Sequence, residues 1–198
     1  KTRTFWVITI VFVLQLFVMS GIQLNTQNFA EQQMGYDVMK AARFMAFALL
    51  ITLPARFIFG WLCDRMNPKY LMSITGIFLM IGSFVLWFFV ISLGWVDDYR
   101  AIWLFAFFQG FGIAGSAIVL PILVGRCFGE KEFPKIMGLV MSGFAIGVIF
   151  GPVTMGKIFD IFGSYAAAFG IAMVFSMAIT FLALFIRTDI KARQHTVV

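Results

Sequence analysis

The chain has 198 residues, of which 62% are hydrophobic and only 12% are charged. An ordinary soluble domain is about half apolar and one quarter charged, so this composition argues against a water-soluble domain and indicates an integral membrane protein. The net charge of +6 comes from basic residues in short clusters between apolar runs. That pattern sets membrane topology and differs from a nucleic-acid-binding surface. The apolar runs are continuous and do not alternate with polar residues, which favours transmembrane helices over a β-barrel.

Six apolar stretches have the length of a transmembrane helix. A helix needs about 20 predominantly apolar residues to cross a bilayer. We therefore predict an all-α membrane protein in which residues 1–198 form one six-helix bundle. The predicted spans are residues 5–24, 38–62, 69–93, 101–124, 134–160 and 165–186.

An arginine lies deep within the second predicted span. Arg56 precedes Asp64 by eight residues, which corresponds to about 12 Å along a helix. An arginine in the hydrocarbon core costs about 2.5–3.5 kcal/mol on insertion scales, so it is expected to have a partner or a function. Thr52, Arg56 and Gly60 recur every four residues and should share one helix face. Pro54 lies between them and frees a backbone carbonyl.

Two interpretations of Arg56 stay open. In the first, the side chain faces a central cavity and binds a substrate anion or takes part in proton coupling. In the second, it is structural and forms an ion pair or hydrogen bonds to carbonyls at a helix end. The chain has no acidic residue at a matching depth, so an acidic partner would have to come from elsewhere.

Small residues predict close helix packing in the later spans. Asn67 is positioned to cap the third helix, with Pro68 at its first helical position. Small residues allow helices to approach closely in lipid. These residues are Gly110, Gly112, Gly115 and Ser116 in the fourth span, and Gly143, Gly147 and Gly151, followed at once by Pro152, in the fifth.

Basic residues are distributed unequally between the two sides of the membrane. Six spans place both termini on one side, which carries ten basic residues against four on the other, with the intramembrane arginine left out. The positive-inside rule therefore predicts that both termini are cytoplasmic. The ten are Lys1, Arg3, Arg65, Lys69, Arg126, Lys131, Lys135, Arg187, Lys191 and Arg193, and the four are Lys40, Arg43, Arg100 and Lys157.

Residues that bind metals or perform covalent catalysis are scarce. Cys63 and Cys127 lie near span ends, and their spacing gives neither a metal site nor a disulfide framework, so we expect free thiols. His195, the single histidine, lies in the polar tail. Because no acid pair, metal cluster or nucleophile–base pair lies at membrane depth, we expect no cofactor, no metal ion and no enzymatic activity.

Three motifs resemble those of the major facilitator superfamily. The resemblance covers essentially the whole chain, and it implies the C-terminal half of a twelve-span secondary transporter, with six helices arranged as two three-helix repeats. Asn67 and Pro68 replace the usual Gly-Arg pair of the first motif, which weakens its basic end. The motifs are Gly60-Trp-Leu-Cys-Asp64-Arg65 with Lys69, similar to G-x-x-x-D-[RK]-x-G-[RK]-[RK]; Gly147-x-x-x-Gly151-Pro152-x-x-x-Gly156; and Asp160-x-x-Gly163-Ser164-Tyr165 with Phe169.

The same resemblance implies a substrate class. The segment Pro54-Ala-Arg56-x-x-x-Gly60-x-x-x-Asp64 is similar to the eighth span of monocarboxylate and oxalate–formate carriers, where an arginine contacts the substrate carboxylate. The implied substrate is a small organic anion bound by Arg56. Gln15 and Gln109 lie in spans that line the cavity in this family, so both are candidate substrate ligands, with interhelical hydrogen bonding as the alternative.

Conformational roles are implied for further residues. Asp64 and Arg65 would hold the cytoplasmic side shut, with plain turn chemistry as the alternative. A helix that must rock against its neighbour needs close packing, and the remaining candidates are Gly60, Gly147, Gly151 and Pro152.

Two functions therefore remain open. The first is transport by alternating access, with the substrate bound between this bundle and an N-terminal six-helix half. The second is a six-span membrane binding or assembly module without transport of its own. The expected partners are a small-molecule substrate, the lipid bilayer and the N-terminal half, and no nucleic acid. Six further apolar runs upstream, with a second loop signature, would favour the transporter.

Overall fold

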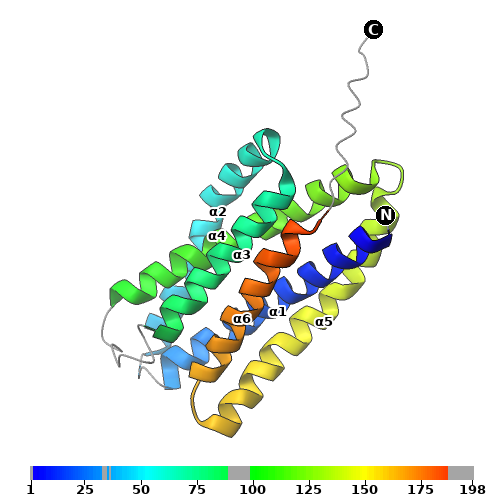
Figure 1. Ribbon diagram of the computed structural model, residues 1–198. Coiled ribbons are helices and arrows are strands. Elements are labelled where there is room, and N and C mark those ends of the chain that lie inside the picture. Colours follow the sequence, from blue (N-terminus) through cyan, green and yellow to red (C-terminus); the bar gives the residue numbers. More distant parts are fainter. Residues whose placement is uncertain (1, 33–34, 36, 89–98, 187–198) are drawn as a thin grey trace.

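The computed structural model describes residues 2–32, 35, 37–88 and 99–186. Within these residues the chain forms six α-helices, which confirms the predicted all-α fold. Each helix is long and apolar enough to cross a membrane. The helices are α1 (Thr2–Gln32), α2 (Val38–Arg65), α3 (Pro68–Val85), α4 (Tyr99–Phe128), α5 (Phe133–Phe162) and α6 (Ala166–Leu184) (Figure 1).

The helices form one bundle whose edges are α2 and α5. Helices α4, α3, α6 and α1 lie between these two edges (Figure 1). Helix α4 packs against both α2 and α3, α3 also packs against α6, and α1 packs against α5 and α6. As a result, the described residues leave most of the surface of α2 and α5 uncovered.

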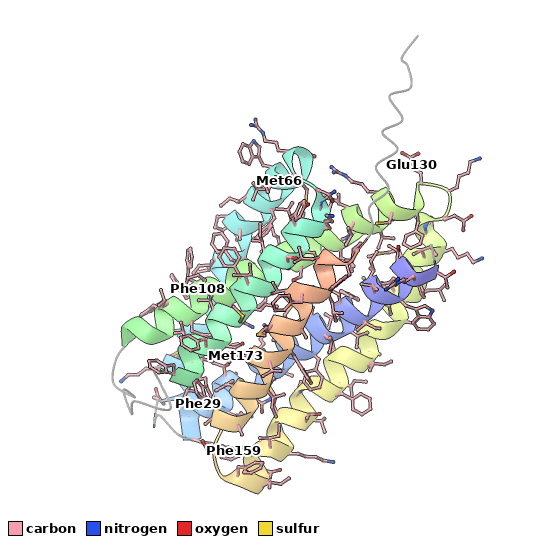
Figure 2. The ribbon with its side chains drawn as sticks, in the orientation of Figure 1. Phe29, Met66, Phe108, Glu130, Phe159 and Met173 are labelled. Carbon is pink, nitrogen blue, oxygen red and sulfur yellow. The ribbon has the colours of Figure 1, made fainter. Side chains whose placement is uncertain are left out.

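The turns sort to the two ends of the bundle as six antiparallel crossings require. Met66, in the α2–α3 turn, and Glu130, in the α4–α5 turn, lie at the end where α1 begins, whereas Phe29 and Phe159 lie toward the opposite end (Figure 2). The α2–α3 turn has the predicted cap, because the side-chain oxygen of Asn67 accepts a hydrogen bond from the Lys69 amide at 3.2 Å.

Helix α1 continues well beyond the predicted span of residues 5–24. Side chains within the added turns hydrogen-bond helix carbonyls: Thr26 Oγ1 donates to the Ile22 carbonyl at 2.6 Å, and Asn25 Nδ2 donates to the Gly21 carbonyl at 2.9 Å. Asn25 Nδ2 also lies 3.3 Å from the Pro152 carbonyl of α5. Tertiary contact therefore extends a helix through a stretch whose polarity had marked the end of the apolar run.

The glycine repeat of α5 is the surface that packs against α1. A Cβ atom at Gly147 would lie 2.7 Å from the Val13 carbonyl oxygen, and one at Gly143 would lie 2.7 Å from Val13 Cγ2. At Gly151 it would overlap the Phe17 carbonyl. Only glycine allows backbone to approach backbone this closely, so the predicted packing face is confirmed.

The glycine stripe of α4 serves two neighbours. A Cβ atom at Gly110 would lie 2.8 Å from the Ala48 carbonyl oxygen of α2, while one at Gly112 would lie 2.6 Å from Leu79 Cδ2 of α3. Successive small residues point to different sides because a helix turns by about 100° per residue. The stripe thus lets α4 fit between α2 and α3.

Candidate functional site

Arg56 lies on the uncovered side of α2. This helix buries only a narrow stripe, which includes Ala48, Ala55 and Phe59 and faces α4. The Arg56 side chain is exposed, and it is flanked by exposed Leu53 and by Phe57, whose surface is 81% exposed. The arginine therefore projects from an apolar helix surface that no other part of the described chain covers.

The Arg56 guanidinium has no ion pair or hydrogen bond among the described residues. It precedes Arg65, the last residue of α2, by nine residues, which is about 13 Å of helix. An arginine at such a depth faces water, an anion or a partner from outside the bundle, because hydrocarbon alone does not stabilise it. The structural alternative finds no partner within the described helices.

Thr52 does not share the exposure of Arg56. Thr52 is buried, and its hydroxyl donates to the Leu49 carbonyl at 2.6 Å. Four residues advance a helix by about 40°, which is enough to carry the chain from the buried edge to the open face. Gly60 is half-buried, and a Cβ atom there would meet nothing within 4 Å. Close packing therefore does not explain this glycine.

Gln15 lies inside the bundle at the meeting point of three helices. It is fully buried, and its Nε2 donates to Thr75 Oγ1 of α3 at 2.9 Å and to Ser116 Oγ of α4. Those hydroxyls in turn donate to carbonyls of their own helices. This geometry is the interhelical hydrogen bonding that the sequence left open as the alternative to substrate binding.

Gln109 is also buried, with 3% of its surface exposed. Its side chain lies beside Gly82 of α3, because a Cβ atom at Gly82 would be 3.4 Å from Gln109 Oε1. Arg56, in contrast, lies on the open side of α2. The structure therefore does not bring Gln15, Gln109 and Arg56 together into one site.

The C-terminal end of α2 is hydrogen-bonded by Arg126, a residue that entered the sequence analysis only as a basic residue that bears on topology. Arg126, in the last turn of α4, donates from Nη2 to the Cys63 carbonyl at 2.6 Å and from Nη1 to the Met66 carbonyl at 3.5 Å. The last carbonyls of a helix lack partners within it and carry partial negative charge, so a cation there is stabilising. The sequence signal for this role was a basic residue at the end of a predicted span. The same signal is expected for a side chain that only extends to the membrane interface.

Two residues of the Gly60–Arg65 motif lie beside the contact between Arg126 and Cys63, and both point outward. Asp64 and Arg65 are both exposed. The Arg65 guanidinium lies 4.3 Å from the centroid of the Trp61 ring, a cation–π contact. Lys69 is placed similarly over Tyr70, at 4.8 Å. Within the described residues, α2 and α4 are joined at this end by Arg126.

The family comparison agrees with this six-helix architecture. The model of the Major Facilitator Superfamily matches residues 1–99 and residues 79–197. The agnestins efflux protein AgnL12 of Paecilomyces divaricatus is 27% identical over 116 residues, which are 58% of this chain and 25% of that protein. The uncharacterized MFS-type transporter YhjX of Escherichia coli (strain K12) is 28% identical over 147 residues, 73% of this chain and 35% of that protein.

The chain thus spans about a quarter to a third of the length of these two curated relatives. Family matches over both parts of the sequence accompany six helices that could each cross a membrane. This multi-pass membrane protein belongs to the Major Facilitator Superfamily.

Proposed function

We propose that the chain is the C-terminal half of a secondary active transporter that moves a small organic anion across the membrane by alternating access. Arg56 is the residue that binds the anionic group of the substrate. The observation that carries the proposal is an exposed arginine, without a partner among the described residues, about 13 Å inside an apolar helix. Intramembrane charges that face a cavity commonly mark substrate pathways.

The surroundings of Arg56 favour a small anion with an apolar body. A guanidinium presents a planar fork of donors that matches a carboxylate with two hydrogen bonds. Leu53 and Phe57 flank it with exposed apolar surface. A monocarboxylate combines these two properties, whereas a polyhydroxylated solute would leave polar groups against Leu53 and Phe57 without partners.

The substrate would be held between this bundle and an N-terminal six-helix half. Helices α2 and α5 offer the largest uncovered surfaces, and they lie at opposite edges (Figure 1). The close α1–α5 contact at Gly147 and Gly151 and the Arg126 link between α4 and α2 favour movement of the bundle as a unit.

The orientation follows from charge. We infer that the end carrying the α2–α3 and α4–α5 turns is cytoplasmic, because ten of the fourteen basic residues outside the membrane core belong to that side. Asp64 and Arg65 then lie at the cytoplasmic face, where a gating role requires them. Gln15 serves helix packing in this proposal, since its donors are already used between helices.

Uptake by the full-length protein tests the proposal. Cells or proteoliposomes are assayed with a panel of small carboxylates and neutral solutes of similar size. We expect uptake of at least one carboxylate, loss of that uptake in Arg56→Gln, and retention in Arg43→Gln. Arg43 is a matched control because it is an exposed arginine on the same helix, near its other end.

Two results would contradict the proposal. Uptake of a neutral solute that persists in Arg56→Gln would show that the protein is a transporter but that Arg56 does not bind a substrate anion. Absence of uptake for every solute, with correctly folded protein in the membrane, would favour the six-span binding or assembly module.

A further inference from the structure

The interface between α3 and α4 contains a buried amide that no neighbouring group binds. Gln109 Nε2 and Oε1 are both buried and have no hydrogen-bond partner among the described residues. Gln109 lies seven residues before Ser116 on α4, and Gly82 lies seven residues after Thr75 on α3. The pair Gly82–Gln109 is therefore two turns, about 10 Å, from the polar contact that Gln15 makes with Thr75 and Ser116.

Such an amide is unfavourable unless something satisfies it. A carboxamide has two donor hydrogens and an acceptor oxygen, and burial of these groups without hydrogen bonds costs free energy. Gln15 repeats the problem on a smaller scale, since its Oε1 also lacks a hydrogen-bond partner among the described residues.

The packing beside Gln109 is looser than elsewhere along this interface. A Cβ atom at Gly82 would find its nearest atom, Gln109 Oε1, at 3.4 Å, an ordinary contact distance. At Gly112, one turn further along α4, a Cβ atom would lie 2.6 Å from Leu79. The α3–α4 interface is therefore tighter at Gly112 than beside the amide.

We infer that an ordered water molecule binds the Gln109 amide inside the α3–α4 interface, and that Gln15 Oε1 marks a second, separate water position. Water is the small ligand that both donates and accepts, as this amide requires, and buried waters characteristically bind otherwise unsatisfied polar groups. The water at Gln109 is then part of the α3–α4 interface, independently of which substrate the protein carries.

Radiolytic hydroxyl-radical labelling of the full-length protein in lipid nanodiscs tests this inference. Radicals formed from a buried water oxidise the side chains next to it, even when bulk solvent cannot reach them. The reporter is Phe105, which is 2% exposed and lies four residues from Gln109 on the same helix face. We expect oxidation of Phe105 in the wild type, loss of it in Gln109→Leu, and no change in Gln27→Leu, a control on the exposed side of α1.

A second variant keeps the test valid if Gln109→Leu does not fold. Gly82→Ala adds a methyl group beside the amide without a steric overlap, so it should displace the water, reduce the oxidation of Phe105 and leave the fold intact. Wild-type Phe105 that is not oxidised would overturn the inference. So would equal oxidation in the wild type and in a folded variant, or a higher melting temperature for Gln109→Leu, the result expected for an amide that binds nothing.

Discussion

The contact between α1 and α5 provides the sharpest test of the packing argument. In Gly147→Ala the added methyl group would lie 2.7 Å from both the Val13 carbonyl oxygen and Leu16 Cβ. Neither atom is the free end of a flexible side chain, so the overlap is relieved only if α1 and α5 move apart. Separation would also weaken the hydrogen bond from Ser20 Oγ to the Gly147 carbonyl, which is 3.3 Å long.

The free-energy cost of the steric overlap at Gly147 can be separated from the effect of helix propensity by comparison with a second glycine on the same helix. Overpacking a tightly filled interior typically costs about 1–3 kcal/mol. Replacing glycine by alanine within a helix gains about 1 kcal/mol of helix propensity, and this gain applies equally to Gly138→Ala. A Cβ atom at Gly138 would meet nothing within 4 Å. The difference between the two variants therefore reports the steric term alone.

Thermal unfolding of the purified full-length protein measures this difference. At about 2–4 °C per kcal/mol for a domain of this size, Gly147→Ala should melt on the order of 2–12 °C below Gly138→Ala. Gly94, which lies between the third and fourth predicted spans, is outside the described residues, so Gly138 is the control. Equal melting temperatures for the two alanine variants would refute the packing argument.

Three further predictions concern charge and topology. If Arg56 binds a carboxylate, Arg56→Gln should lose a charge-assisted hydrogen bond worth about 1.5–3 kcal/mol, which is roughly 10- to 150-fold in substrate affinity. Arg56→Lys should retain weak binding. Undiminished stabilisation of Arg56→Gln by substrate in thermal-shift assays would contradict this prediction. Arg126→Gln should lower the melting temperature more than Arg65→Gln, because only Arg126 donates to helix-end carbonyls, and equal losses would count against that role. A cysteine at Asn28 should react with an impermeant maleimide in intact cells while Cys127 stays protected, and the reverse pattern would invert the proposed orientation.

The general architecture could be predicted because it depends on local properties of the sequence. A continuous apolar segment in the hydrocarbon core has few alternatives to the α-helix, because each of its backbone polar groups must be hydrogen-bonded within the segment. Continuous apolar runs therefore predict helices directly, and the Asn67 cap with Pro68 predicts where α3 begins. The spacing of Gly143, Gly147 and Gly151 likewise predicts a packing face, because residues four apart align on one side of a helix.

The partners of individual side chains depended on tertiary structure. The sequence presents Gln15, Gln109 and Arg56 as comparable polar residues within apolar runs. The fold places Gln15 between α3 and α4, leaves the Gln109 amide buried beside Gly82, and exposes Arg56 on the open side of α2.

The extension of α1 and the role of Arg126 were decided in the same way. The sequence by itself determined that the chain forms apolar membrane helices, where they lie along the chain and which faces carry small residues, because these follow from local hydropathy and helical periodicity. The tertiary structure decided which helix meets which, because contacts such as Asn25 with Pro152 and Arg126 with Cys63 join residues far apart in sequence. Such pairs have no local periodicity that could reveal them.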